Sequence, residues 1–304
     1  MAKDGYSKVF LAKNADRISG IKKVLQYFEL DTFRGKNVAL KANFNSGDPF
    51  PASTHPETLK SLIDCLGKSG TGRITLIERS GMGNTRDVLE KLGIFKLSQE
   101  MGFEVVVLDE EERDSWVKIE KHGTHWLKGF YIPRIICDAD MVVQTCCLKT
   151  HSFGGHFTLS LKNSVGLVAK KLPGSIYDYM AELHISPYQR SMIAEINNYY
   201  PVDLVLMDAM KIFVDGGPAK GTIAEPGLIL ASSDRVALDA VGVAILRYHG
   251  TTKAVSKGKI FELNQIHRAA ELEVGISSPE EIELVPLDEE SQELTPDLET
   301  ILKN

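Results

Sequence analysis

The stretch "MVVQTCCL", residues 141–148, is an almost continuous apolar run. A strand with one face in water alternates between apolar and polar residues, and this run shows no such alternation. Runs of this kind are typical of strands buried on both faces, the usual situation in a parallel sheet flanked by helices. The run therefore predicts a central strand, and the rest of the chain has to supply its neighbours.

Strand and helix patterns alternate on both sides of this run. The other predicted strands are 37–44, 73–78, 103–109, 203–210 and 227–233. The predicted helices are 56–70, 85–102 with a break at Gly93, and 234–250 with Asp234 as N-cap. This alternation predicts an α/β fold of three layers, a mostly parallel sheet flanked by helices on both faces.

The whole chain, 1–304, is expected to form one domain, because it contains no linker, repeat or low-complexity tract. Two segments depart from the strand–helix alternation. Residues 110–186 are predicted to hold irregular insertions around the functional site, including extra strands near 110–135. Residues 285–304 form an acidic tail, which is expected to be a solvated face or a frayed end.

Composition narrows the class of protein. The formal net charge of the 304 residues is −6, whereas nucleic-acid binders usually carry a basic domain, so no nucleic acid is expected as a partner. No apolar run approaches the roughly 18 residues of a membrane span. The N-terminal "MAKDGYSKVF" lacks the apolar core of a signal peptide. A cytoplasmic protein without a membrane partner is expected.

The four cysteines are Cys65, Cys137, Cys146 and Cys147, and they form no CxxC pair. This spacing argues against a structural zinc site or an iron–sulfur cluster held by the chain alone. Cys146 and Cys147 are neighbours on the predicted strand, so their side chains should point to opposite faces. They are either two small buried apolar residues or a redox pair.

Ligands of open parallel sheets bind beyond the carboxyl ends of the strands, so the residues after each strand are the candidates for a site. Lys41 and Asn43 follow the first strand and share one face. The next helix begins at "THPE", in which Thr54 and Glu57 fit a capping box. Either this loop and helix start bind an anion, with Lys41 supplying charge, or they are an ordinary loop and a well-capped helix.

The residues after the second strand read "ERSGMGNTRDV". Gly81 and Gly83 lack the third glycine of a dinucleotide-binding GxGxxG motif. A glycine-rich turn into a helix capped by Asn84 or Thr85 is the simpler interpretation.

The central strand is followed by a segment without acids, because no Asp or Glu occurs between Asp140 and Asp178. The segment contains Lys149, His151, Gly154, Gly155, His156, Lys162, Lys170 and Lys171. A solvated basic face normally carries interspersed acids, so the gap predicts a pocket for a negatively charged ligand. A basic surface patch is the alternative. A metal site is disfavoured, because the two histidines have no carboxylate nearby in sequence.

Two acids near the other strand ends are also candidates. Asp208 ends the apolar stretch "LVLM", a position where an acid can serve a site. Asp239 falls on the apolar face of the helix that Asp234 begins. A carboxylate in that position must be paired within the protein or reach the site.

The chain resembles the family known as domain of unknown function 362. The resemblance covers about residues 35–250 and rests on ordered motifs: "KANF", "THPETL", "DADMVVQTCCLKTH", "LKNSVGL", "VLMDAM", "DGGPAKG" and "SSDRVALDAVG". It implies an α/β domain and places ten residues in family motifs: Lys41, Asn43, His55, Lys149, Thr150, His151, Lys162, Asn163, Asp208 and Asp239. One departure is "CCLKTH", where relatives usually have a proline before the lysine.

Many relatives also carry a cysteine-rich, ferredoxin-like segment, which this sequence lacks. The resemblance therefore implies no built-in electron supply. Any redox reaction would use a flavin or a nicotinamide and a separate ferredoxin-like electron donor.

The leading hypothesis is an enzyme that acts on an anionic small molecule, a carboxylate or a phosphate. Lys149, His151 and Asp208 are the predicted catalytic residues, with His151 as general acid or base because imidazole titrates near neutral pH. The predicted substrate-binding residues are Lys41, Asn43, His55, Thr150, Lys162, Asn163 and Asp239. The alternative is a non-catalytic carrier of an anionic metabolite or a metal cofactor. Either hypothesis requires Lys41, His151, Lys162 and Asp208 to converge.

Overall fold

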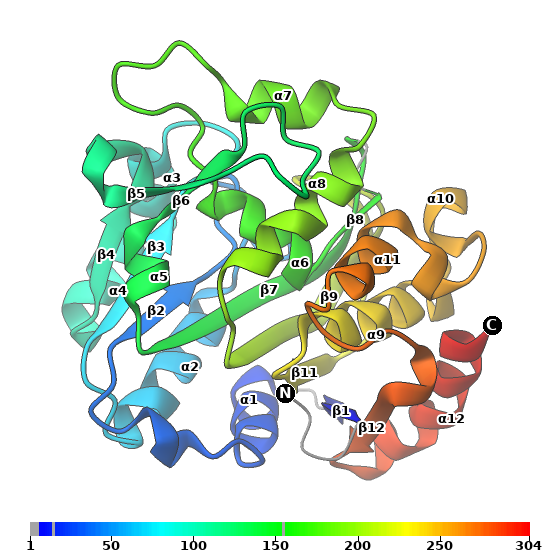
Figure 1. Ribbon diagram of the computed structural model, residues 1–304. Helices are drawn as coiled ribbons and strands as arrows, with labels where there is room; N and C mark the ends of the chain where they lie inside the picture. Colours follow the sequence, from blue (N-terminus) through cyan, green and yellow to red (C-terminus); the bar gives the residue numbers. More distant parts are fainter. Residues whose placement is uncertain (1–5, 14–15, 154–155) are drawn as a thin grey trace.

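A mixed, mostly parallel sheet forms the centre of the protein in a computed structural model (Figure 1). The structure describes residues 6–13, 16–153 and 156–304. The glycine pair at 154–155, noted in the basic segment, lies outside these ranges.

Eight strands follow one another in the order β12-β1-β11-β9-β7-β2-β3-β4. Their bounds are β1 Ser7–Lys13, β2 Val38–Lys41, β3 Ile74–Glu78, β4 Glu104–Val107, β7 Met141–His151, β9 Leu204–Gly216, β11 Leu228–Ser232 and β12 Ile282–Pro286. Neighbours are parallel except at β1–β11 and β11–β9. Short antiparallel strands β8 (His156–Thr158) and β10 (Gly221–Ala224) extend the ends of β7 and β9.

The central strands are buried on both faces, as the apolar run predicts. On β9, Val205 and Met207 belong to one apolar cluster, whereas Leu204 and Leu206 belong to the cluster on the opposite face. Successive residues of a strand point to opposite faces, so this division shows a sheet with a core on each side. The three-layer α/β prediction is confirmed.

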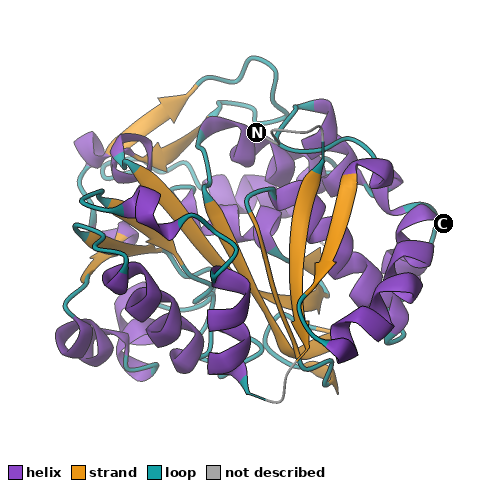
Figure 2. Cartoon of the chain, turned by 90° about the horizontal axis from the view of Figure 1, so that it is seen from below, coloured by secondary structure: helices purple, strands orange, loops and turns teal. Residues whose placement is uncertain are grey.

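Helices cover both faces of the sheet (Figure 2). One face packs against α1 (Arg17–Leu25), α2 (Pro56–Lys68), α3 (Thr85–Lys91) and α4 (Ile94–Met101). The other face packs against α6 (Ser160–Asn163), α8 (Gln189–Ile196), α9 (Arg235–Tyr248), α10 (Lys253–Ser256), α11 (Asn264–Glu271) and α12 (Glu289–Lys303). None of the helices in the described ranges is long and apolar enough to cross a lipid bilayer.

Local signals set the helix ends where the sequence predicts them. Asp234 caps α9, since its carboxylate accepts hydrogen bonds from the backbone N–H groups of Val236 and Ala237. Asn84 caps α3 in the same way. Gly93 separates α3 from α4 with a φ of 72°, a conformation that glycine adopts at little cost.

The acidic C-terminal segment differs from its prediction. Residues 289–303 form α12. Its N-cap is Asp288, whose carboxylate accepts a hydrogen bond from the Ser291 N–H. Leu294, Leu298 and Leu302 are buried in the apolar cluster that includes α9. The frayed-end alternative is therefore wrong, because a stripe of leucines at helical spacing lies between the acids. The acids of the helix are themselves exposed, which agrees with the solvated-face alternative.

The segment 110–186 is more regular than expected. β5 (Trp116–Ile119) and β6 (Phe130–Pro133) pair into a separate two-stranded sheet, followed by α5 (Arg134–Asp138). Further along come β7, α6 and α7 (Tyr179–Ile185). Part of this segment forms a third apolar cluster over β2, β3 and β7, on the same face as α8.

Candidate functional site

The carboxyl ends of β2, β3 and β7 border a cavity of about 310 Å³, here called the carboxyl-edge cavity. The strands are parallel, so their ends meet at one edge of the sheet. Lys41, the last residue of β2, is opposite Gln144, so β7 continues past β2 and brings Lys149 and His151 over the edge. Six predicted site residues line the cavity: Lys41, Asn43, Lys149, His151, Lys162 and Asn163.

Lys41 is committed to an ion pair within the protein. Its ammonium lies 2.6 Å from Glu78 Oε1 and also donates to Ala42 O and Asn163 Oδ1. Glu78 accepts two further bonds, from the N–H groups of Phe44 and Arg79. Burial lowers the pKa of Lys41 and raises the pKa of Glu78, and each charge opposes the shift of the other. The pair carries no net charge. Because the three N–H groups of Lys41 all have acceptors, none is free for a ligand.

Gly166 lies directly against this ion pair. A Cβ at this position would come within 2.7 Å of Lys41 Cε and 3.1 Å of Glu78 Oε1. Contacts under 3.0 Å are far inside the usual separation of carbon atoms. The absence of a side chain at 166 therefore allows the lysine and the glutamate to meet.

Lys149 is a buried cation without a carboxylate. Its three N–H groups donate to Asn43 Oδ1 at 2.9 Å, to Pro51 O at 2.9 Å and to Ala52 O. None of its acceptors is charged, and burial lowers its pKa. Its hydrogen bonds are satisfied, but its positive charge is not neutralised.

Lys162 combines an uncompensated charge with free donors. It lies on α6, is partly exposed and lines the cavity. Within the described ranges, no hydrogen bond or ion pair involves its ammonium. Burial and the nearby charges of Lys149 and Arg79 lower its pKa to about 8. An oxyanion in the cavity would meet an ammonium with all three N–H groups open.

His151 is neutral and presents an N–H to the cavity. Burial and the positive charges of Lys162 and Lys149 lower its pKa to about 2. Its Nδ1 accepts a hydrogen bond from the Phe153 N–H at 3.1 Å, so the ring proton belongs on Nε2. The Nε2–H has no partner in the part of the chain that the structure describes. His151 is thus suited to donate to an anion, as a neutral electrophile.

Two further polar atoms at the cavity wall, Arg79 Nε and Thr158 Oγ1, are buried without a partner among the residues that the structure describes. Arg79 uses its other nitrogens on Ser80 O, Val165 O and Met180 Sδ, none of which is a carboxylate. Leaving a buried donor unsatisfied costs about 1–3 kcal/mol.

His184 brings a titratable group to the cavity from α7. Its Nδ1 lies 2.6 Å from Met180 O, and since a carbonyl only accepts, Nδ1 is the donor. The lone pair of the neutral ring is therefore on Nε2. His184 can accept a proton there, whereas the neutral His151 can only donate a hydrogen bond to the cavity.

Asp208 lies outside the cavity lining. It lies within β9, and its Oδ2 accepts from Arg17 Nε at 2.8 Å and from the Thr58 hydroxyl at 2.5 Å. Its Oδ1 accepts from the Met210 N–H. This arrangement does not support the catalytic role predicted for Asp208, because its carboxylate joins β9 to α1 and α2. Convergence holds for Lys41, His151 and Lys162 only.

Asp239 supports the site without lining it. Its carboxylate accepts from the N–H groups of Ser160 and Leu161 and from the Ser160 hydroxyl, at 2.6–3.0 Å. Burial raises its pKa to about 7, and these hydrogen bonds oppose the shift. Asp239 thereby fixes the start of α6, the helix that carries Lys162, and the prediction that it contacts substrate is replaced by this indirect role.

Three other candidates also have structural partners away from the cavity. His55, not Thr54, caps α2, because its Nδ1 accepts from the Glu57 N–H. The Thr150 hydroxyl donates to Phe213 O and Gly216 O. His156 accepts at Nε2 from Arg190.

The site residues that the sequence interpretation missed are Glu78, Arg79, Thr158 and His184. Glu78 is the last residue of β3 and Arg79 follows it, where the strand-end rule should have found them. The glycines after them drew attention to a nucleotide motif instead. Thr158 and His184 carry no comparable signal, since packing alone brings β8 and α7 to the cavity.

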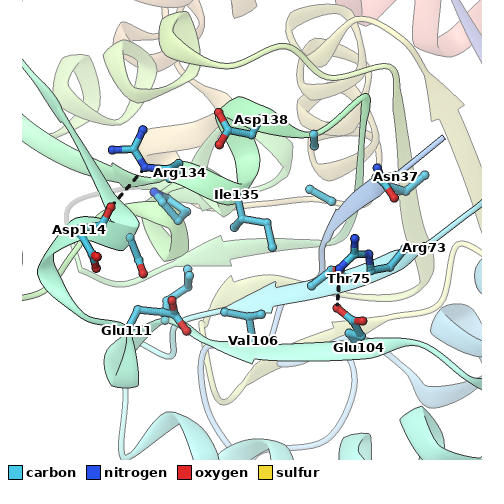
Figure 3. A pocket seen from close by; sticks show the side chains of 16 residues that line it. Asn37, Arg73, Thr75, Glu104, Val106, Glu111, Asp114, Arg134, Ile135 and Asp138 are labelled. Carbon is cyan, nitrogen blue, oxygen red and sulfur yellow. Dashed lines mark hydrogen bonds and ion pairs between the residues drawn. The ribbon is translucent and has the colours of Figure 1, made fainter.

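A larger hollow, of about 710 Å³, lies near the amino ends of β2, β3 and β4 and against α5 (Figure 3). We call it the amino-edge groove. Its charged side chains have both signs and are mostly exposed: Arg73, Glu104, Glu111, Asp114, Arg134 and Asp138. Arg134 Nε donates to Asp114 O, and the Thr75 hydroxyl donates to Glu104. Water can solvate these charges without a ligand.

The cysteines have inert surroundings. Cys146 and Cys147 are buried, and burial raises the pKa of both thiols, to about 11 for Cys147. A thiol with a raised pKa is a poor nucleophile. Across residues 6–13, 16–153 and 156–304 there is no group of three His, Cys, Asp or Glu residues that could hold a metal ion.

Comparison with known proteins identifies a family. The family model described as "Domain of unknown function (DUF362)" matches residues 38–244. The thylakoid-associated protein sll1697 of Synechocystis sp. is 26% identical over 251 residues, covering 82% of this chain and 74% of that protein. The lactate racemase apoprotein from Thermoanaerobacterium thermosaccharolyticum is 16% identical, with a TM-score of 0.49, and the match covers 82% of this chain and 58% of that one. Since the family match spans most of the chain, this protein belongs to the domain of unknown function 362 family.

Proposed function

We propose that this protein is an enzyme that binds a small anionic molecule, a carboxylate or a phosphate, in the carboxyl-edge cavity and transfers protons on it. The observation that carries the proposal is the unbalanced charge. Arg79, Lys149 and Lys162 line the cavity, and none of them forms an ion pair in the described residues. Among the described residues of the lining the one acid is Glu78, which is already paired with Lys41.

The charges of Asp109, Glu78 and Asp178 partly offset that of Arg79, whereas no carboxylate of the described residues acts on Lys149 or Lys162. Two buried or partly buried cations without counter-charges are costly to the fold alone. An anion with one or two negative charges would offset this cost. The open donors of Lys162 and His151 match its oxygens. An apolar side of the cavity, formed by Met82, Phe153 and Met180, suits a carbon skeleton attached to the anionic group.

The two histidines suit different tasks. Neutral His151 donates from Nε2 and would polarise a substrate oxygen, while its neighbouring cations keep it unprotonated. His184 has its lone pair on Nε2 and would take or return a proton. This assignment moves the acid–base role predicted for His151 to His184.

The test is ligand-induced thermal stabilisation of the purified protein by phosphates, carboxylates, flavins and nicotinamides. At 100 times its dissociation constant, a ligand that binds only the folded state stabilises it by about 2.7 kcal/mol. Lys162→Met should weaken binding of the stabilising anion by roughly 10- to 100-fold, the value of a charge-assisted hydrogen bond. Lys170→Met is the matched control, because Lys170 is an exposed lysine of the same segment outside the cavity.

His184→Gln separates an enzyme from a carrier. An enzyme should keep its affinity for the anion and lose proton exchange between the bound ligand and deuterium oxide, followed by NMR. A carrier would bind equally well in both forms and show no exchange in either. Stabilisation by no anion, or equal losses in the Lys162 and Lys170 variants, would contradict the proposed site.

A further inference from the structure

Lys162 differs from the other lysines of the cavity in what its amino group can do. All three N–H groups of Lys41 and all three of Lys149 have acceptors within the protein. Both amines are also buried, with 2% and 0% of their residue surface exposed. Lys162 is partly exposed to the cavity and has no partner in the described chain. Only its nitrogen is free to approach a ligand atom.

We propose that Lys162 forms an imine, through Nζ, with the carbonyl carbon of a small 2-oxo acid, a proposal that rests on the anion site described above. A 2-oxo acid carries a carboxylate and a reactive carbonyl on adjacent carbons. The cavity supplies cations and open donors for the first group and a free amine for the second. A phosphate or a simple carboxylate would use the donors but leave the amine without a reaction.

The amine has to be unprotonated to attack. Burial and the charges of Lys149 and Arg79 lower its pKa to about 8. Roughly one quarter of Lys162 is therefore neutral at pH 7.5, against about one in a thousand for an ordinary lysine. A neighbouring cation is a recognised means of activating a lysine nucleophile. The cationic surroundings thus serve both the carboxylate and the nucleophile.

The step is balanced without an added oxidant or reductant. The nitrogen lone pair forms the C–N bond while the carbonyl oxygen takes a proton, which gives a carbinolamine. The hydroxyl then leaves as water, and the nitrogen loses its remaining proton as the C=N bond forms. His184 Nε2 can relay these protons, and the unpartnered Thr158 hydroxyl can rotate to donate to the carbonyl oxygen.

Two other open donors of the same cavity would hold the carboxylate. His151 offers its Nε2–H, and Asn43 offers Nδ2, because its Oδ1 is held by Lys149. Both residues line the cavity. The carboxylate would lie against these neutral donors, within the field of Lys149 and Arg79, and leave the carbonyl carbon beside the amine.

Reductive trapping tests the proposal on the folded protein. Pyruvate and 2-oxoglutarate are the probes, sodium cyanoborohydride reduces any imine, and peptide mass spectrometry locates the adduct. We expect the adduct on Lys162 at least ten times faster than on exposed Lys170, and its loss in Lys162→Arg. Propionate, which binds as an anion but has no carbonyl, should slow the labelling without being incorporated.

Equal labelling of Lys162 and surface lysines, or no adduct, would overturn the imine. The same samples distinguish this from failure of the anion site. If propionate still stabilises the protein thermally and Lys162→Met still weakens its binding, the anion site stands and only the covalent step is refuted. If no anion stabilises the protein, both proposals fall. Circular dichroism of Lys162→Arg establishes that loss of the adduct is not loss of the fold.

Discussion

The carboxyl-edge cavity and the amino-edge groove lie at opposite ends of the same strands, β2 and β3, and differ in almost every other respect. The groove is the larger, at about 710 Å³ against about 310 Å³. Its charges are exposed and of both signs. The cavity holds buried or partly buried charges with an excess of cations, and several of its donors have no acceptor. Of these two hollows, volume alone would favour the groove as the binding site. The buried charges and the donors without partners favour the cavity.

The difference follows from where water can reach. An exposed arginine in the groove loses little by lacking a partner, because water hydrates it. A lysine in the cavity has lost that hydration, so its charge has to be matched by the protein or by a ligand. Unmatched charge is thus informative only where it is buried. Three variants and a pH series can break or sharpen this contrast.

The largest effect is expected from Glu78→Gln in the cavity. The substitution keeps the side-chain shape but leaves the ammonium of Lys41 buried without its counter-charge. Removing one partner of a buried pair typically lowers the free energy of unfolding by about 3–5 kcal/mol. Urea denaturation at pH 7 measures the change.

Glu104→Gln in the groove is the matched control for this substitution. Glu104 is exposed and lies 3.8 Å from Arg73, so its removal should change the free energy of unfolding by no more than about 0.5 kcal/mol. Similar costs for the two variants would mean that the two ends of the sheet do not differ as described.

An intermediate effect is expected from pH. The pKa of Lys162 is lowered from 10.5 to about 8 in the folded protein, so between these values the unfolded chain binds more protons than the folded one. Under that condition the free energy of unfolding rises with pH. The contribution of Lys162 should be on the order of 1 kcal/mol, after allowance for its partial exposure.

Comparison of wild type with Lys162→Met isolates this contribution. Urea unfolding at pH 7.5 and pH 10 should show a smaller rise in the Met variant, whereas Lys170→Met should rise like wild type. An identical rise in all three proteins would show that Lys162 titrates as an ordinary surface lysine.

The smallest effect is expected from Arg134→Ala in the groove. Arg134 is exposed, and its one recorded hydrogen bond is to Asp114 O. The free energy of unfolding should change by no more than about 0.5 kcal/mol. The thermal stabilisation by the anion that binds wild type should not change. A clear loss of that stabilisation would place the ligand in the groove and reverse the contrast.

Much of the fold could be predicted from the sequence because its signals are local. The apolar run of β7, the caps Asp234 and Asn84, and the break at Gly93 each act within a few residues. β1 and β12 were not predicted, since their pairing is decided by distant partners. The buried leucines of α12 were not recognised, because the acids between them dominate the composition of the segment.

The site residues, too, were predicted where the signal is local and missed where it depends on distant partners. Lys149, His151 and Lys162 were found because a long segment without acids is visible in the sequence itself. The ion pair of Lys41 with Glu78 was missed, because two strands have to be laid side by side before the charges meet. Asp208 and Asp239 were given site roles because a buried acid looks the same in sequence whether it serves a ligand or a helix end.

The position of β1 has a consequence for the order of events during synthesis. β1 is made first, yet it lies between β11 and β12, and Phe10 is opposite Ala231. Its neighbours emerge only after more than two thirds of the chain has been translated, which takes on the order of ten seconds or longer at usual elongation rates. Until then the nascent chain carries an unpaired apolar strand, "VFLA". Chaperone binding to this strand would be strongest early in translation and would end when β11 arrives.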